Sequence, residues 1–141
     1  MSLIREYELC VRSELSNLAQ IAEFISDRAR LMGMDEDQVF EVQMAVDEAC
    51  TNAMEHAYEG RLDGEVRICC YTQRDRFVVR VIDYGKPFSP DDVPAPRTDA
   101  PLEEREIGGL GLFFMRKLMD RVEIRSNEQG NEVVMVKIKS A

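Results

Sequence analysis

A long helical pattern near the middle of the chain is the feature that most constrains its fold. Asp35 followed by Gln38 resembles a capping box, and the helical periodicity continues from there to about Tyr58. At about 100° per residue, one broad arc of apolar side chains is formed by Val39, Val42, Val46, Ala49, Cys50, Ala53 and Ala57. We expect this arc to pack on a sheet. The side that faces away would then carry Gln43, Asp47 and Thr51.

The remaining segments predict strands and two further helices around this central helix. Strands are predicted at residues 3–12, 65–73, 76–83, 121–126 and 132–139. A helix that begins at Ser13 has an apolar face of Leu18, Ile21, Ala22, Ile25 and Ala29. The last helix opens at the glycines from Gly108 onward. This order predicts a single domain over residues 1–141, an α+β two-layer sandwich with a mixed, mostly antiparallel β-sheet and three helices on one face.

Residues 86–106 differ from the rest of the chain. All five prolines lie in this stretch, together with six acidic residues. A segment of this length inside a compact domain is usually a functional lid or a disordered segment. Because predicted elements flank it on both sides, we favour a lid, at about residues 86–107.

Charge and hydropathy exclude several functions. The chain has 27 acidic and 18 basic residues, a formal charge of −9, and shows no basic stripe, so direct nucleic-acid binding is not expected. It has neither a long apolar run nor a secretory signal, so we predict a cytoplasmic protein that makes no membrane contact. The four cysteines form no CxxC pair and are read as reduced thiols.

The central helix carries a polar pair in the stretch DEACTNAMEHAYEG, at the edge of its apolar arc. Glu48 and Asn52 lie one turn apart there. An Asn oxygen can coordinate Mg²⁺, and a Glu can accept a proton from a nucleophile. A solvated polar pair that borders a packed face is the alternative reading.

Two further motifs bear on this choice. Alternation in FVVRVIDYGKPF places Asp83 at the end of a run of inward-facing apolar residues, where the exocyclic amine of a purine could donate to it and Gly85 would let a ligand approach the backbone. A cap or turn Asp is the alternative. The sequence GGLGL, from Gly108 to Leu112, precedes a helix and favours phosphate, although a lone GxG is a weak signal. Together the three motifs predict one nucleotide pocket.

The same residues resemble a known family. Glu48-Ala-Cys-Thr-Asn52 with His56-Ala57-Tyr58, Asp83-Tyr-Gly85 and Gly109-Leu-Gly111-Leu112 are similar to the N-box, G1 box and G2 box of the ATPase superfamily of histidine kinases, gyrase B, Hsp90 and MutL. Within this superfamily, whose shared ATPase domain is the Bergerat fold, the chain most resembles the bacterial anti-sigma factor serine/threonine kinases.

The resemblance implies roles for individual residues. Glu48 would be the general base, and Asn52 the Mg²⁺ ligand. Asp83 would read adenine, with Gly85 in the same site. Phosphate contacts would come from Gly109, Leu110, Gly111 and Leu112. Arg105 would contact the γ-phosphate, although three residues, Glu106, Ile107 and Gly108, separate it from the second glycine box. Relatives commonly have a Thr where this chain has Asn131, and His56 reads as a structural helix residue.

The resemblance also implies an activity and partners. The chain would be an ATP-dependent anti-sigma factor that transfers phosphate to a serine or threonine of an anti-sigma factor antagonist, a STAS-type protein, in a partner-switching pathway. ATP and Mg²⁺ would be required. It would bind a sigma factor and form a homodimer, for which Phe40, Met44 and Met54 are candidate surface residues unless they pack under the first helix. The alternatives are an ATP-binding switch module without kinase activity and a histidine-kinase-type ATPase domain.

Overall fold

The computed structural model describes residues 4–87 and 107–140, with the backbone alone for 107–110. In these residues one sheet is formed by β1 (Tyr7–Arg12), β2 (Glu65–Gln73), β3 (Arg76–Asp83), β4 (Arg121–Asn127) and β5 (Gly130–Ile138). The strand order is β1-β2-β3-β5-β4, and each neighbouring pair is antiparallel. The expected α+β architecture is confirmed. The sheet was predicted to be mixed and mostly antiparallel, and all of its described strand pairs are antiparallel.

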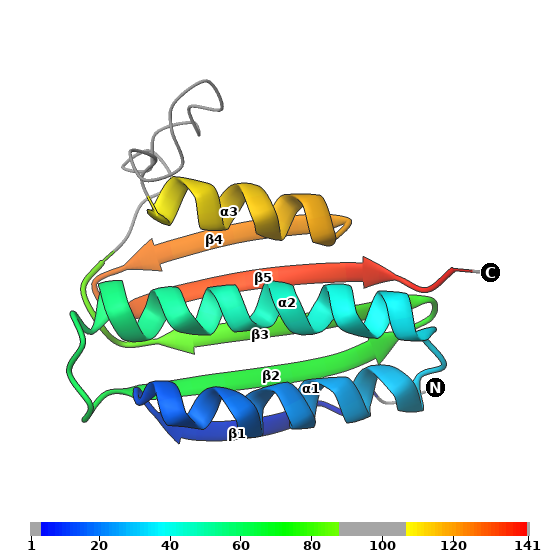
Figure 1. Cartoon of the computed structure of the whole chain (residues 1–141), viewed down its shortest axis with the longest axis horizontal. Coiled ribbons are helices and arrows are strands. Elements are labelled where there is room, and N and C mark those ends of the chain that lie inside the picture. The colour runs from blue at the N-terminus through cyan, green and yellow to red at the C-terminus, as the bar shows by residue number, and fades with distance from the viewer. Residues whose placement is uncertain (1–3, 88–106, 141) are drawn as a thin grey trace.

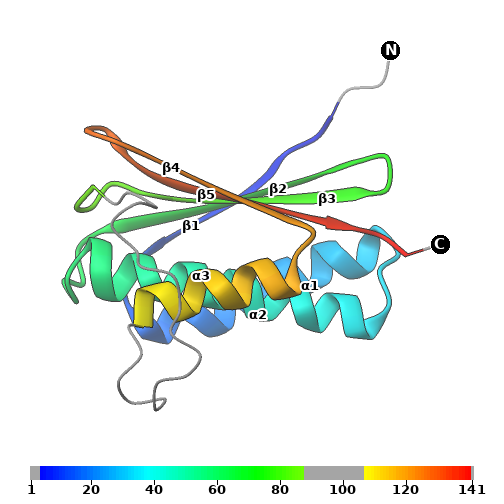
Figure 2. The ribbon, with the colours of Figure 1, turned by 90° about the horizontal axis from the view of Figure 1, so that it is seen from above.

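The helices all cover one face of this sheet (Figures 1 and 2). They are α1 (Leu18–Leu31), α2 (Glu36–Asn52) and α3 (Ile107–Leu118). A 3-10 turn, Leu15–Asn17, precedes α1, so the first helix begins after Ser13. A π-helical turn, Ala53–Ala57, continues α2 and carries the helical segment to the predicted end near Tyr58.

The start of α2 is capped as predicted, but by one interaction rather than two. Asp35 Oδ1 accepts a hydrogen bond of 2.8 Å from the backbone N–H of Gln38. In a capping box the side chain at Gln38 would return to the backbone of Asp35. Here its Nε2 instead donates to the carbonyl of Ile138 at 3.0 Å, which ties the helix start to the end of β5.

The apolar arc of α2 forms the centre of the core. Val39, Val42, Val46, Ala49, Cys50 and Ala53 are buried against the sheet, as predicted, and Ala57 is half-buried. The first helix buries Ile21, Ile25 and Ala29 and leaves Leu18 and Ala22 half-buried.

The outer side of α2 differs from the prediction. Gln43 does not face away, because α1 packs beside α2 and Ser26 Oγ donates to Gln43 Oε1 at 2.9 Å. Asp47 and Thr51 are half-buried. The exposed side instead carries Phe40 and Met44, which are 58% and 46% exposed.

The helix-free face of the sheet is covered by charged side chains. Arg80 pairs with Glu132 at 2.7 Å and with Glu6 at 3.2 Å, and Arg67 pairs with Glu8 at 2.6 Å. These long side chains shield apolar surface with their aliphatic stems, so Cys69 is buried on this face. All four cysteines are free thiols. Among the described residues, no helix has the length and apolar character needed to cross a membrane.

Candidate functional site

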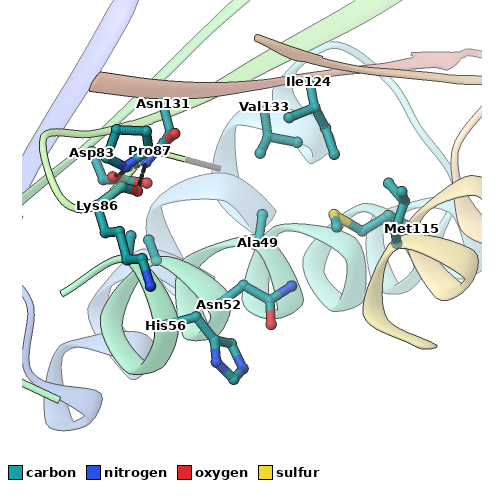
Figure 3. Close-up of a pocket in the computed structure, with 13 residues that line it drawn as sticks. Ala49, Asn52, His56, Asp83, Lys86, Pro87, Met115, Ile124, Asn131 and Val133 are labelled. Atoms are coloured by element: carbon teal, nitrogen blue, oxygen red, sulfur yellow. Dashed lines mark hydrogen bonds between the residues drawn. The ribbon is translucent and has the colours of Figure 1, made fainter. Parts of the chain in front are cut away.

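A pocket of about 340 Å³ lies where the end of α2, the end of β3 and the start of α3 meet (Figure 3). Its apolar walls are formed by Ala49, Ala53, Leu112, Met115, Ile124 and Val133. Its polar groups are Asn52, His56, Asp83, Lys86 and Asn131. Mainly apolar walls with a few convergent polar groups are typical of small-molecule sites. The structure therefore brings Asn52 and Asp83 together in one cavity, as the sequence predicted.

Asp83 is the buried carboxylate of this pocket, with 6% of its surface exposed. Its Oδ1 accepts from Asn131 Nδ2 at 2.8 Å and from the backbone N–H of Gly85 at 2.9 Å. Burial raises the pKa of Asp83, and these two donors act in the opposite direction. Because both donors use Oδ1, the other carboxylate oxygen is available to accept from a ligand.

Asn131 is a site residue whose role the sequence did not predict. It pairs directly with Asp83 across β3 and β5, and its side chain also donates to the carbonyl of Lys86 at 2.8 Å. Ser126 Oγ, from β4, donates to Asn131 Oδ1 at 2.6 Å. This chain of hydrogen bonds fixes the Asp83 carboxylate. The strand pairing that creates it is a long-range feature, so only a correct register between the two strands could have revealed it.

Gly85 is also required for packing within the chain. A Cβ at this position would lie 2.5 Å from the carbonyl oxygen of Ala57. The next residue, Lys86, donates its backbone N–H to that same oxygen at 2.8 Å. Gly85 therefore allows the turn after β3 to approach the π-helical turn, rather than serving a ligand's approach alone. Tyr58 supports the same junction, since its hydroxyl accepts from the Tyr84 N–H at 2.8 Å.

Asn52 and Glu48 occupy different positions relative to the pocket. Asn52 lines it, and its Oδ1 is buried without a hydrogen-bond partner among the described residues. Glu48 lies one turn earlier, is half-buried and is not part of the pocket wall. Burial raises the pKa of Glu48, the charges of Asp47 and Glu55 add to this effect, and His56 opposes it.

The second glycine motif lies inside α3 rather than in a loop before it. The helix starts at Ile107, so Gly109 and Leu110 belong to its first turn, where the backbone N–H groups have no partner within the helix. The predicted phosphate-binding loop is therefore a helix N-terminus, which has the same preference for anions. Leu112 is buried in the pocket wall.

Gly111 connects the two motifs directly. A Cβ there would lie 2.5 Å from Glu48 Oε1 and 3.0 Å from Asn52 Nδ2. A larger residue at this position would require these two side chains to shift. The sequence assigned Gly111 to the phosphates, and the structure places it against Glu48 and Asn52.

Other predicted elements lie outside the described residues. Arg105 and most of the predicted lid, residues 88–106, are among them. Two residues that the sequence did not assign to the pocket, His56 and Lys86, also line it and are exposed (Figure 3).

No group of three or more His, Cys, Asp or Glu side chains in the described residues could hold a metal ion. Mg²⁺ commonly binds through one or two protein oxygens, with water and substrate phosphates completing its shell. Asn52 Oδ1 fits that pattern, since within the described part of the chain it is a buried acceptor without a donor, which is otherwise unfavourable.

A family model described as the histidine kinase-like ATPase domain matches residues 11–137. A serine-protein kinase RsbW of Bacillus pumilus is 37% identical over 119 residues, covering 80% of this chain and 73% of that protein. Its counterpart in Bacillus subtilis is 38% identical over 117 residues, covering 80% and 72%. The Listeria innocua protein is 32% identical over 134 residues, covering 92% and 83%.

Solved structures agree with the fold. The RsbU and RsbW domains of a Mycobacterium tuberculosis protein superpose with a TM-score of 0.72 at 15% identity, over 97% of this chain and 33% of that chain. The catalytic domain of the histidine kinase ThkA gives a TM-score of 0.56 at 16% identity, over 98% and 97%. The chain belongs to the histidine kinase-like ATPase family, and RsbW serine-protein kinases are among its curated relatives.

Proposed function

We propose that this chain is an ATP-dependent protein serine/threonine kinase that also acts as an anti-sigma factor. Its substrate is an anti-sigma factor antagonist, and the products are ADP and the phosphoprotein. The observation that carries the proposal is that one pocket contains both the buried Asp83 carboxylate and the Asn52 oxygen, which has no hydrogen-bond partner among the described residues. The identity of 37% to an RsbW serine-protein kinase supports the choice of reaction.

Nucleotide binding follows from the two ends of the pocket. The free oxygen of Asp83 accepts from the exocyclic amine of adenine, and the apolar walls enclose the ring. The phosphates extend toward Asn52 and the N-terminal turn of α3, where Gly109 and Leu110 offer backbone N–H groups. Lys86 and His56 lie at the pocket mouth and reduce the repulsion that a polyphosphate meets in an acidic protein.

Phosphoryl transfer uses the polar edge of α2. Bound Mg²⁺ supplies charge neutralisation for the phosphates, and Asn52 Oδ1 is the protein atom that would hold it. Glu48 takes the proton of the substrate hydroxyl as that oxygen bonds to the γ-phosphorus and the bond to the ADP oxygen breaks. The raised pKa of Glu48 makes this carboxylate a better proton acceptor than an ordinary glutamate. Arg105, in the predicted lid, is the proposed γ-phosphate contact.

The partners are a sigma factor, a STAS-type antagonist and a second copy of this chain. Phe40 and Met44, exposed one turn apart on α2, support a protein-binding face there. Met54, the third candidate from the sequence, is 1% exposed and is not part of that face. The cytoplasm, where a sigma factor and its antagonist meet, is the proposed location.

An ATP-gated binding module without kinase activity is the second candidate. It is favoured by one observation, namely that Glu48 stands behind the pocket wall rather than in it. Binding of ATP would still follow from Asp83 and Asn52 in this case. The two candidates therefore differ only in whether phosphate reaches a protein hydroxyl.

Calorimetry of Mg-ATP binding, followed by a γ-phosphate transfer assay with candidate antagonists, tests the proposal. Asp83→Asn is the variant to compare with the wild type. An asparagine can still accept from Asn131 and Gly85 through its oxygen, but it directs an amide toward the adenine amine. We expect the fold to be retained and ATP binding to be lost. Unchanged affinity would rule out the adenine role, and binding without transfer would favour the binding module.

A further inference from the structure

A second pocket lies at the other end of the helix layer from the candidate nucleotide site. It has a volume of about 390 Å³ and is formed by the end of α1, the start of β1, the end of β2 and the start of β3. Phe77 belongs to it, whereas Asp83, six residues along the same strand, belongs to the first pocket. At about 3.3 Å per residue, roughly 20 Å separates the two sites. They share no residue in the described chain.

The floor of this second pocket is apolar. Phe77 and Cys70 are each 1% exposed and face the helix layer. Tyr7 is the direct cross-strand partner of Cys70, so the same face of the sheet continues to β1. Met32, half-buried just after α1, covers the cavity from the helix side. Burial raises the pKa of the Cys70 thiol to about 12, so this thiol is neutral and places no negative charge in the floor.

Two arginines give the pocket its charge. Arg5 and Arg28 both line it, and neither forms an ion pair with a described carboxylate. The nearby acids are already engaged, since Asp27 and Glu36 both pair with Arg30. In a chain with a formal charge of −9, two guanidinium groups without a carboxylate partner in one cavity are unexpected.

Arg28 is also held in an orientation suited to binding. Its guanidinium carbon lies 4.1 Å from the centroid of the Tyr7 ring. Stacking on an aromatic face fixes the plane of the guanidinium and leaves its edge, with its N–H donors, directed sideways. The Nε of Arg28 is buried and has no hydrogen-bond partner among the described residues. A buried donor that has no acceptor among the described residues can be satisfied by a bound acceptor.

We propose that this pocket binds a carboxylate carried on an apolar or aromatic body. The carboxylate would be held by Arg28 and Arg5, in the forked geometry that guanidinium groups form with carboxylates. The apolar body would rest on Phe77 and Met32. This chemistry can come from a free organic acid or from an acidic side chain beside an apolar one in a docked protein segment. The proposal is independent of ATP binding.

This site is tested by titrating small-molecule probes into the protein and monitoring two-dimensional NMR spectra that include the arginine Nε–H region. The probes are 3-phenylpropionate, its neutral amide, inorganic phosphate and the capped dipeptide acetyl-Phe-Asp-amide. We expect the carboxylate probes to shift the Arg28 Nε–H and the Tyr7 and Cys70 amides in a saturable way. The neutral amide and phosphate should not. Tighter binding of the dipeptide would identify a protein segment as the source, and tighter binding of 3-phenylpropionate a free acid.

Variants separate this site from nonspecific charge effects. Arg28→Gln should weaken binding of the carboxylate probes at least about tenfold. Arg5→Gln, at an exposed position before β1, should weaken it without affecting the fold. Arg30→Gln is the matched control, because Arg30 is exposed and already paired, and it should leave binding unchanged. Three outcomes would overturn the proposal. They are no binding of both carboxylate probes, binding of the neutral amide or phosphate as tight as that of the carboxylates, and full affinity in both Arg28→Gln and Arg5→Gln.

Discussion

Asn131 donates to Asp83 Oδ1 at 2.8 Å, and this contact joins the start of β5 to the end of β3 inside the candidate nucleotide pocket. The donor holds one carboxylate oxygen and leaves the other for a ligand. It also lowers the pKa of Asp83, which burial raises. Asn131 is thus a positioning residue for the group proposed to read adenine.

Replacing Asn131 should therefore affect binding through the ionisation of Asp83. In Asn131→Ala the pKa of Asp83 should rise further, because a donor to its charged form is lost. ATP affinity should fall at neutral pH. It should fall further as the pH is lowered, and this decline should begin at a higher pH than in the wild type. Calorimetry between pH 5.5 and 8 measures this shift. Gln129→Ala, in the adjacent exposed turn, is the control, and a pH profile identical to the wild type in Asn131→Ala would contradict the role.

Gly111 gives a test of how closely α3 and α2 fit. In Gly111→Ala the new Cβ would come within 2.5 Å of Glu48 Oε1, the end of a flexible side chain that can move aside. Alanine also favours a helix over glycine by about 1 kcal/mol, so the free energy of unfolding should change by no more than about that amount. Phosphate transfer should fall by about tenfold or more, because Glu48 and Asn52 are displaced together.

Urea unfolding and the transfer assay, run side by side, measure the two effects of Gly111→Ala. Phe114→Ala on the same helix is the control, since Phe114 is 51% exposed and does not line the pocket. Full transfer activity in Gly111→Ala would mean that the position of Glu48 is not critical. Loss of stability by several kcal/mol would mean that the contact is a packing constraint instead.

Local patterns in the sequence predicted most of the fold and part of the site. The strands β2 and β3 were predicted with their observed bounds, because alternation and a short polar turn are encoded within a few residues. The bounds of β4 and β5 differ from the predicted ones by one or two residues. The Asp35 cap and the buried arc of α2 were predicted for the same reason. Glu48, Asn52 and Asp83 were recognised as chemical groups before their proximity was known.

What the sequence did not predict depends on contacts between distant segments. The role of Asn131 requires the register of β5 against β3. The choice left open for Phe40, between the surface and a position under α1, requires the position of α1 beside α2. The contact of Gly111 with Glu48 requires α3 to lie on α2. No local periodicity encodes such contacts, because they follow from packing.

The ionisation of Glu48 provides a test of its proposed role as general base. Glu48→Gln should still bind Mg-ATP and lose transfer by a factor of about 10²–10⁴. In the wild type, transfer should decline on the acid side as Glu48 is protonated, and this decline should lie above the pH of an ordinary glutamate because burial and two acidic neighbours raise its pKa.

Glu55→Gln should move the acid-side decline in phosphate transfer to lower pH. Glu55 is exposed, and its negative charge raises the pKa of Glu48. Removing the charge favours ionised Glu48, so the acid limb of the rate profile should move to lower pH. Transfer rates measured from pH 4.5 to 8 detect this, with Glu59→Gln as an exposed control for the loss of one negative charge. An acid limb that stays in place in Glu55→Gln would show that another group titrates.

The thiol of Cys10 should be unreactive although it is exposed. Its Sγ donates to Glu8 Oε1 at 3.0 Å, and this hydrogen bond, with burial and the charge of Glu8, raises the pKa of the thiol to about 11. At pH 8 the thiolate fraction is therefore about 10⁻³.

Glu8→Gln should bring the pKa of Cys10 back toward its ordinary value and increase its alkylation about tenfold or more. The gain is partly offset because a less basic thiolate is a weaker nucleophile. Glu65→Gln should have a smaller effect because its contribution to the shift is smaller. Mass spectrometry of the intact protein after timed alkylation measures these rates, and rapid alkylation of wild-type Cys10 would contradict the hydrogen bond to Glu8.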